Sequence, residues 1–269
     1  MFVNVALFGQ CVENRSTFEN RITRGPARAL PRNSAQSRGR DHARRWRACS
    51  TLHWTQRLPD RGVVSARYTL PTLVFVLGGP GSGKGTQCRR LAEELNWATV
   101  CVGQLLREEA TLRRKEPRGA YLEHLLSRGE IVPGHITIEL LLDRCAAFSG
   151  KSGGILVDGF PRALEQAEAF ERAAGASCAF AVFFACSEDV MISRLLERGR
   201  TSNRTDDNLE TIQRRLITFR HTSMPVIEKY RQLGKLVEIN ADADVDSVAA
   251  AVRREFAIRG FTRNVNVEI

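Results

Sequence analysis

The chain has 269 residues, of which 43% are hydrophobic and 26% charged, and 40 Lys+Arg against 30 Asp+Glu give a net charge of +10. These proportions are typical of an ordinary globular protein. They exclude a collagen-like or repeat protein, and no run reaches the 18 apolar residues of a membrane span.

The positive charge is concentrated at the N-terminus. Residues 1–70 contain 13 Arg, no Lys and four acidic residues, which is +9 and leaves +1 for the remainder. Three prolines interrupt this segment and no periodicity is sustained in it. We interpret it as an N-terminal extension whose composition resembles an organelle transit peptide. A solvated tail, an incorrectly assigned gene start and a nucleic-acid-binding arm are the alternatives.

Cysteine usage points to an intracellular protein. The seven cysteines are an odd number and form no C-x-x-C pair. We therefore expect neither a disulfide framework nor a zinc site, and interpret the cysteines as reduced thiols. They lie at positions 11, 49, 88, 101, 145, 178 and 186.

From residue 71 onward, short apolar runs alternate with helical patterns. The runs predict buried strands at Leu73–Leu77, Ala98–Cys101, Ile155–Val157, Ala179–Ala185 and Lys235–Ile239. Helical periodicity is strongest at Cys88–Leu95, Ile136–Phe148, Asp189–Leu196, Leu209–Phe219 and Val245–Phe256. This alternation predicts an α/β domain with a parallel five-stranded sheet flanked by helices.

A glycine-rich segment, GGPGSGKGTQ (78–87), follows the first strand directly. Glycines let backbone N–H groups approach phosphate oxygens, and the following helix directs its positive end at the same anion. Lys84 adds a point charge for the β and γ phosphates. The spacing fits a P-loop, although Gly85 stands where the general motif has Ser or Thr. We expect ATP contacts from Gly81, Ser82, Gly83, Lys84, Gly85 and Thr86.

Beyond this loop the chain resembles the nucleoside monophosphate kinases, over roughly residues 73–256. The resemblance rests on GGPGSGKGTQ and on LLRE (105–108), GEIVPGHITIELL (129–141), VDGFPR (157–162), RLLERGRTSNRTDDN (194–208) and TSMPVIEKY (222–230). Within this family the segments look most like UMP-CMP (uridylate) kinases, and adenylate kinases are the close relatives. The resemblance implies a P-loop NTPase-type fold with an NMP-binding insertion at about 101–132 and a short lid at about 199–209.

The resemblance also assigns roles to arginines. Transfer between two phosphorylated nucleotides depends on positioning and charge neutralisation, which the planar, permanently charged guanidinium provides. Arg107 and Arg162 look like clamps on the acceptor phosphate, and Arg198 like the lid residue on the ATP side. Arg204 and Arg215 resemble the pair that bridges toward the transferred group, and Arg194 assists. With Lys84, we expect Arg198, Arg204 and Arg215 to be catalytic.

Asp158, at the end of the third strand, suits Mg²⁺ held through water, because this ion keeps much of its hydration shell. A helix N-cap role for Asp158 is the alternative. The family usually has a second acidic residue where this chain has Gln104.

Two positions bear on the base of the acceptor, and they disagree. Val102 brings no hydroxyl, unlike the Thr usual in adenylate kinases, whereas Gln166 matches adenylate kinases and some fungal uridylate kinases. The resemblance places Glu130, Ile131, Val132, Gly159, Phe160 and Pro161 around the acceptor nucleotide and Ala243 against the ATP base.

We therefore expect reversible phosphoryl transfer from ATP to UMP, CMP or dCMP with Mg²⁺, by an intracellular monomer. By resemblance it acts in the cytoplasm or nucleus, with a mitochondrion or plastid as the alternative that the extension suggests. An adenylate kinase, and a nucleic-acid-binding protein acting through its basic arm, are the other readings. The expected organisation is an extension (1–70), a kinase domain (71–260) and a tail (261–269).

Overall fold

The computed structural model describes residues 70–201 and 207–262. The N-terminal extension, most of the C-terminal tail and the lid positions Asn203 and Arg204 lie outside the described residues. Within the described residues, no helix is both long enough and apolar enough to cross a bilayer.

Five strands form one parallel sheet in the order β2-β3-β1-β4-β5, which confirms the predicted fold class. The strands are β1 (Thr72–Gly78), β2 (Ala98–Cys101), β3 (Gly154–Asp158), β4 (Phe180–Ala185) and β5 (Leu236–Asn240). Each predicted strand is present, and no end differs from the prediction by more than one residue.

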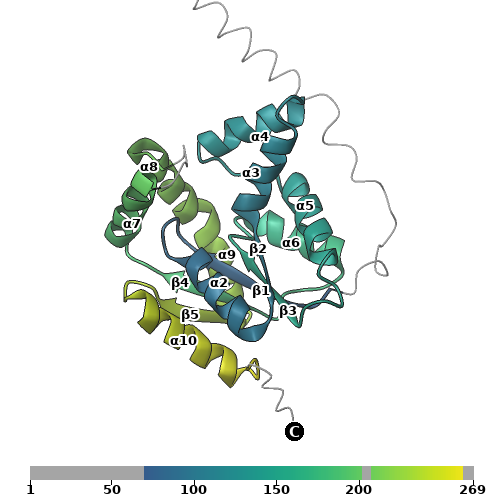
Figure 1. The fold of residues 1–269 in the computed structure, drawn as a ribbon, viewed down its shortest axis with the longest axis vertical. Helices are drawn as coiled ribbons and strands as arrows, with labels where there is room; N and C mark the ends of the chain where they lie inside the picture. The colour runs from purple at the N-terminus through teal and green to yellow at the C-terminus, as the bar shows by residue number, and fades with distance from the viewer. Residues whose placement is uncertain (1–69, 202–206, 263–269) are drawn as a thin grey trace, which may run out of the picture. The chain divides into compact units, whose positions relative to one another are not determined.

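Helices connect the strands (Figure 1). They are α2 (Lys84–Leu95), α3 (Val102–Leu112), α4 (Pro117–Ser127), α5 (Gly134–Ala146), α6 (Leu164–Ala174), α7 (Glu188–Thr201), α8 (Leu209–Thr218), α9 (Met224–Gln232) and α10 (Val245–Ile258). A π-helical turn, η1 (Phe219–Ser223), joins α8 to α9.

The sheet divides the core into two layers because successive side chains of a strand point to opposite faces. Leu73, Phe75 and Leu77 of β1 pack with α3, α5, α6 and α9 on one face. Val74 and Val76 pack with α2 and α10 on the other. All five side chains are at most 4% exposed. The central strand is therefore held from both sides, and the loop that follows it begins from a rigid base.

The differences from the predicted helices have local causes. Helix α2 begins four residues earlier than expected, because its first turn comes from the glycine-rich loop and carries no apolar period. Helices α3, α4, α6 and α9 were not predicted. The signal for α6 is weak because it buries Gln166 and alanines besides a single large apolar residue, Phe170. Helix α7 runs to Thr201 and so takes in the first residues of the expected lid.

A candidate phosphoryl-transfer site at the carboxyl ends of the strands

The P-loop leaves β1 and enters α2 through glycines in left-handed conformations. Gly81 and Gly83 have φ values of 85° and 84°, which side chains rarely adopt. The loop is also tightly packed: a Cβ on Gly79 would lie 2.3 Å from the Sδ of Met191, and one on Gly81 only 2.5 Å from the Met191 carbonyl oxygen. Gly81 therefore meets both constraints, whereas Gly83 is favoured by its conformation alone and Gly79 by the limited space beside Met191.

Lys84 folds back onto this loop. Its Nζ donates to the Gly79 carbonyl at 2.6 Å and to the Ser82 hydroxyl at 3.1 Å. The pKa of Lys84 is lowered to about 8, chiefly by burial and also by the positive charges of Arg162 and Arg215, against the opposing attraction of Asp158. The ammonium thus lies among other cations. A polyanion such as a phosphate chain bound here would stabilise its charged form.

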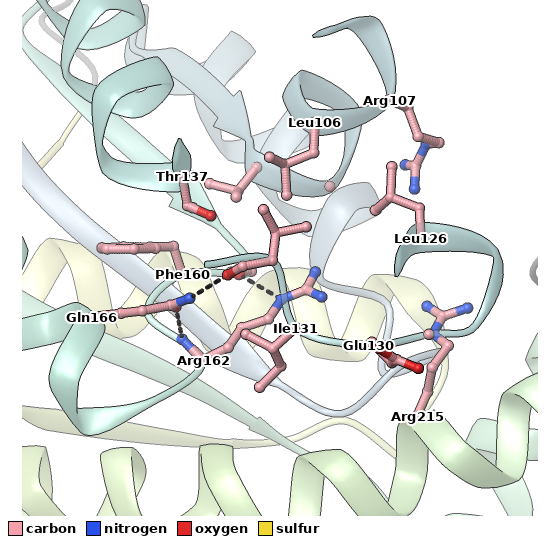
Figure 2. Close-up of a pocket in the computed structure, with 15 residues that line it drawn as sticks. Leu106, Arg107, Leu126, Glu130, Ile131, Thr137, Phe160, Arg162, Gln166 and Arg215 are labelled. Atoms are coloured by element: carbon pink, nitrogen blue, oxygen red, sulfur yellow. Dashed lines mark hydrogen bonds between the residues drawn. The ribbon is translucent and has the colours of Figure 1, made fainter. Parts of the chain in front are cut away.

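Three arginines face one pocket, which Figure 2 shows. Arg107 comes from α3, Arg162 from the loop after β3, and Arg215 from α8. Gly103 lies against the first two: a Cβ there would be 3.6 Å from both terminal nitrogens of Arg107 and 3.7 Å from Nη2 of Arg162. The absence of a side chain at Gly103 leaves the space between these two guanidinium groups open.

Arg162 is fixed by hydrogen bonds to its backbone and its side chain. Its N–H donates to Oε1 of Gln166 at 3.0 Å, and its Nε donates to the Gly159 carbonyl at 3.0 Å. The Nε2 of Gln166 donates in turn to the Val132 carbonyl at 3.3 Å (Figure 2). The buried amide of Gln166 therefore joins the two walls of the pocket, so any contact with a base would use only its remaining lone pair and N–H.

The other acceptor-side residues from the sequence lie at the same place. Glu130, Ile131, Val132, Gly159 and Phe160 line the pocket of Figure 2. Pro161 lines an adjoining hollow that also contains Lys84, Arg162 and Arg215. This pocket and the P-loop lysine are thus neighbours across a single cleft.

Sequence reasoning missed several lining residues. These are Gly103, Leu106, Leu126, Gly129 and Thr137. Leu106, Gly129 and Thr137 lie within motifs that carried the family resemblance, which was the available signal. The apolar residues Leu106 and Leu126 resemble ordinary core leucines in the sequence.

Asp207 connects two of the predicted catalytic arginines. Its carboxylate, with no exposed surface, accepts from Nε and Nη2 of Arg198 at 2.6 and 2.7 Å and from Nη1 of Arg215 at 3.1 Å. Asp207 thus ties the segment before α8 to one arginine of α7 and one of α8. Arg204 lies outside the described residues.

The loop around Ala243 is tied to two other elements. Arg194 of α7 donates to the Ala241 carbonyl at 2.9 Å and to the Ala243 carbonyl at 3.2 Å. Gln87 of α2 donates to the Val245 carbonyl at 2.9 Å. The segment that the family resemblance places at the ATP base is therefore fastened to the helix that follows the P-loop.

Asp158 ends β3 beside the P-loop and is 6% exposed. Its alternative role as an N-cap is wrong, because α6 begins later, with Ala163 as its N-cap. A Cβ on Gly85 would lie 3.4 Å from Oδ2 of Asp158, so the first turn of α2 lies directly against this carboxylate. Gln104 instead donates to Glu108 at 2.9 Å. A single carboxylate beside a phosphate site fits Mg²⁺, which needs few protein ligands.

Known proteins match most of the described chain. The family model for adenylate kinase matches residues 76–235. A UMP-CMP kinase of Lentinula edodes is 41% identical over 69% of this chain and 86% of its own length. The uridylate kinase of Saccharomyces cerevisiae is 43% identical over 66% of this chain and 86% of its own length. The human UMP-CMP kinase is 38% identical over 71% of this chain and 99% of its own length.

Proposed function

Because the chain belongs to the adenylate kinase family, we propose that it transfers the γ-phosphoryl group of ATP to a pyrimidine nucleoside monophosphate, UMP, CMP or dCMP, and back. The observation that carries this proposal is the single cleft in which Lys84, Arg162 and Arg215 face one another from three different elements. Converging cations between two nucleotide sites suit a reaction in which negative charge moves from one phosphate to another.

The acceptor phosphate is the nucleophile, so the site needs no general base. In our proposal Arg107 and Arg162 bind the acceptor phosphate, while Lys84 and the P-loop amides bind the phosphates of ATP. Arg198 and Arg215 neutralise charge on the transferred group, with Arg204 joining them from the lid. Bringing the reactants into line in a cleft that excludes water would supply most of the rate enhancement.

Asp158 would hold Mg²⁺ through water at the edge of the P-loop. When bound, the ion would neutralise phosphate charge and help to orient the β and γ groups. Gln104 brings no charge here, so Asp158 would be the main protein group for the ion.

Two observations support a pyrimidine acceptor. The relatives compared above are named UMP-CMP kinase or uridylate kinase. Val102, 2% exposed, lines the acceptor pocket and offers no hydroxyl to a base. We further propose that the chain is an intracellular monomer in which residues 71–260 form the kinase domain.

A coupled assay of ADP release tests the proposal, using UMP, CMP, dCMP and AMP as acceptors. We expect kcat/KM to be highest for a pyrimidine monophosphate. A maximum with AMP would make the protein an adenylate kinase, and no stimulation by any monophosphate would refute kinase activity.

A further inference from the structure

The turn η1 interrupts the long helical segment from α8 to α9. The N–H of Met224 donates to the carbonyl of Phe219, five residues back, instead of four as in an α-helix. Pro225 follows and has no N–H to donate, so the regular ladder cannot run through this point. Single π-helical turns of this kind occur frequently at functional sites.

The widened turn brings Ser223 against the loop after β3. The Ser223 hydroxyl donates to the carbonyl oxygen of Arg162 at 3.1 Å, although 61 residues separate the two in the chain. Ser223 also borders the hollow that contains Lys84, Arg162 and Arg215. A residue on the helical segment that carries Arg215 therefore contacts the backbone of an acceptor clamp.

This bond completes the fixation of Arg162. Gln166 accepts from its N–H, Ser223 donates to its C=O, and the Gly159 carbonyl accepts from its Nε. Both peptide groups that flank its Cα are thereby held by side chains of separate elements. Fixing the backbone on both sides restricts the direction in which the long side chain leaves the loop.

We propose that Ser223 is a positioning residue that orients Arg162 toward the acceptor phosphate. It acts from the segment that carries Arg215, so the two guanidinium groups are held in a fixed relation across the cleft. This inference rests on the proposed function, since it concerns the affinity and alignment of the acceptor.

The test compares Ser223→Ala with a matched variant of the same turn. Thr222 also uses its hydroxyl, which donates to the Thr218 carbonyl at 2.7 Å within the helix. One neutral hydrogen bond corresponds to a factor of about 3 to 10 in an equilibrium. We expect Ser223→Ala to lower kcat/KM for UMP by about that factor and to leave the KM for ATP unchanged. Thr222→Val should leave both constants unchanged, whereas Ser223→Thr, which keeps the hydroxyl, should restore kcat/KM for UMP.

A double-mutant cycle separates positioning from general loosening of the turn. In an Arg162→Ala background, Ser223→Ala should cause no further loss of UMP affinity, measured by titration, because its effect passes through the missing guanidinium. Any of three results would overturn the inference. Thr222→Val could lower kcat/KM for UMP as much as Ser223→Ala does, Ser223→Ala could still weaken UMP binding in the Arg162→Ala background, or Ser223→Ala could have wild-type kinetics. If wild type itself phosphorylates no monophosphate, the proposed function fails instead, so the two failures are distinct.

Discussion

Asp207 and Arg198 form a two-point ion pair in which Oδ2 and Oδ1 of a fully buried carboxylate accept from Nε at 2.6 Å and from Nη2 at 2.7 Å. Arg215 adds a third bond to the same carboxylate. A buried charge is tolerated only when it is paired and hydrogen-bonded in this way. The pair therefore sets the relative positions of two arginines that we place in the catalytic machinery.

We expect Asp207→Asn to lower both stability and activity. The amide keeps the shape but loses the charge, so the free energy of unfolding should fall by about 2 kcal/mol, as for hydrogen bonds to charged groups. The kcat for UMP should fall at least about tenfold, because misplaced guanidinium groups stabilise the transition state less well. Urea unfolding and steady-state kinetics measure the two effects. As a control, Glu188→Gln removes the exposed pair with Arg220 and should change stability by less than about 0.5 kcal/mol.

Replacing Lys84 by Ala should lower kcat by at least about 10²-fold, since the site loses one charge-stabilising group aimed at the phosphates. The matched control is Lys229→Ala, which removes a lysine that bonds to Glu168 away from the cleft. It should leave turnover unchanged. Near-normal turnover in the Lys84 variant would refute the role that we assign to this lysine.

The pH dependence of ATP use should follow the titration of Lys84. Its pKa of about 8 in the free protein means that the ammonium loses its proton as the pH rises through 8. The kcat/KM for ATP should therefore fall above pH 8, whereas kcat should hold to higher pH because bound phosphates raise the pKa of Lys84.

The same group makes stability depend on pH. In the folded state the pKa of Lys84 lies below its ordinary value, so the unfolded chain binds more protons between pH 8 and 10.5. The free energy of unfolding should therefore rise across that interval. Lys84→Met should abolish this rise in stability.

Two buried glutamines give a reciprocal test of the two nucleotide sites. Gln166 hydrogen-bonds to Arg162 and Val132 on the proposed acceptor side, whereas Gln87 hydrogen-bonds to Val245 next to the proposed ATP-base loop. Each Gln→Leu change leaves a carbonyl without this partner, an effect of about 1–3 kcal/mol. We expect Gln166→Leu to raise the KM for UMP about tenfold and leave that for ATP unchanged, and Gln87→Leu to do the reverse. If either variant changed the KM for UMP and the KM for ATP equally, it would contradict the claim that each glutamine supports one nucleotide site.

Removing residues 1–69 should leave the kinetic constants unchanged, because the sheet and the described site residues lie between 70 and 262. The extension carries nearly all of the net positive charge. If it binds nucleic acid, full-length protein should bind RNA or DNA with strong salt dependence, and the truncated chain should not. A truncated protein that folds but has lost activity would show that the extension contributes to the site.

Much of the fold was predictable because its signals are local. Continuous apolar runs predict buried strands, and the glycine-rich loop between Leu77 and Lys84 predicts a phosphate site at the end of the first of them. Helices α3, α4, α6 and α9 were not among those predicted. Helix α6 buries small and polar residues, and η1 arises from a backbone adjustment near Pro225 that no periodicity reveals.

The sequence by itself determined the class of chemistry: glycines that admit a phosphate chain, a lysine in register, and arginines in the order of a nucleotide kinase. It could not determine which side chains hold those arginines. The deciding hydrogen bonds join different elements or cross loops: Asp207 with Arg198, Gln166 with Arg162 and Val132, and Ser223 with the Arg162 carbonyl. Only the folded chain decides them, because a hydrogen bond forms or fails on differences of a few tenths of an ångström between donor and acceptor. Those separations are set only when the helices have packed.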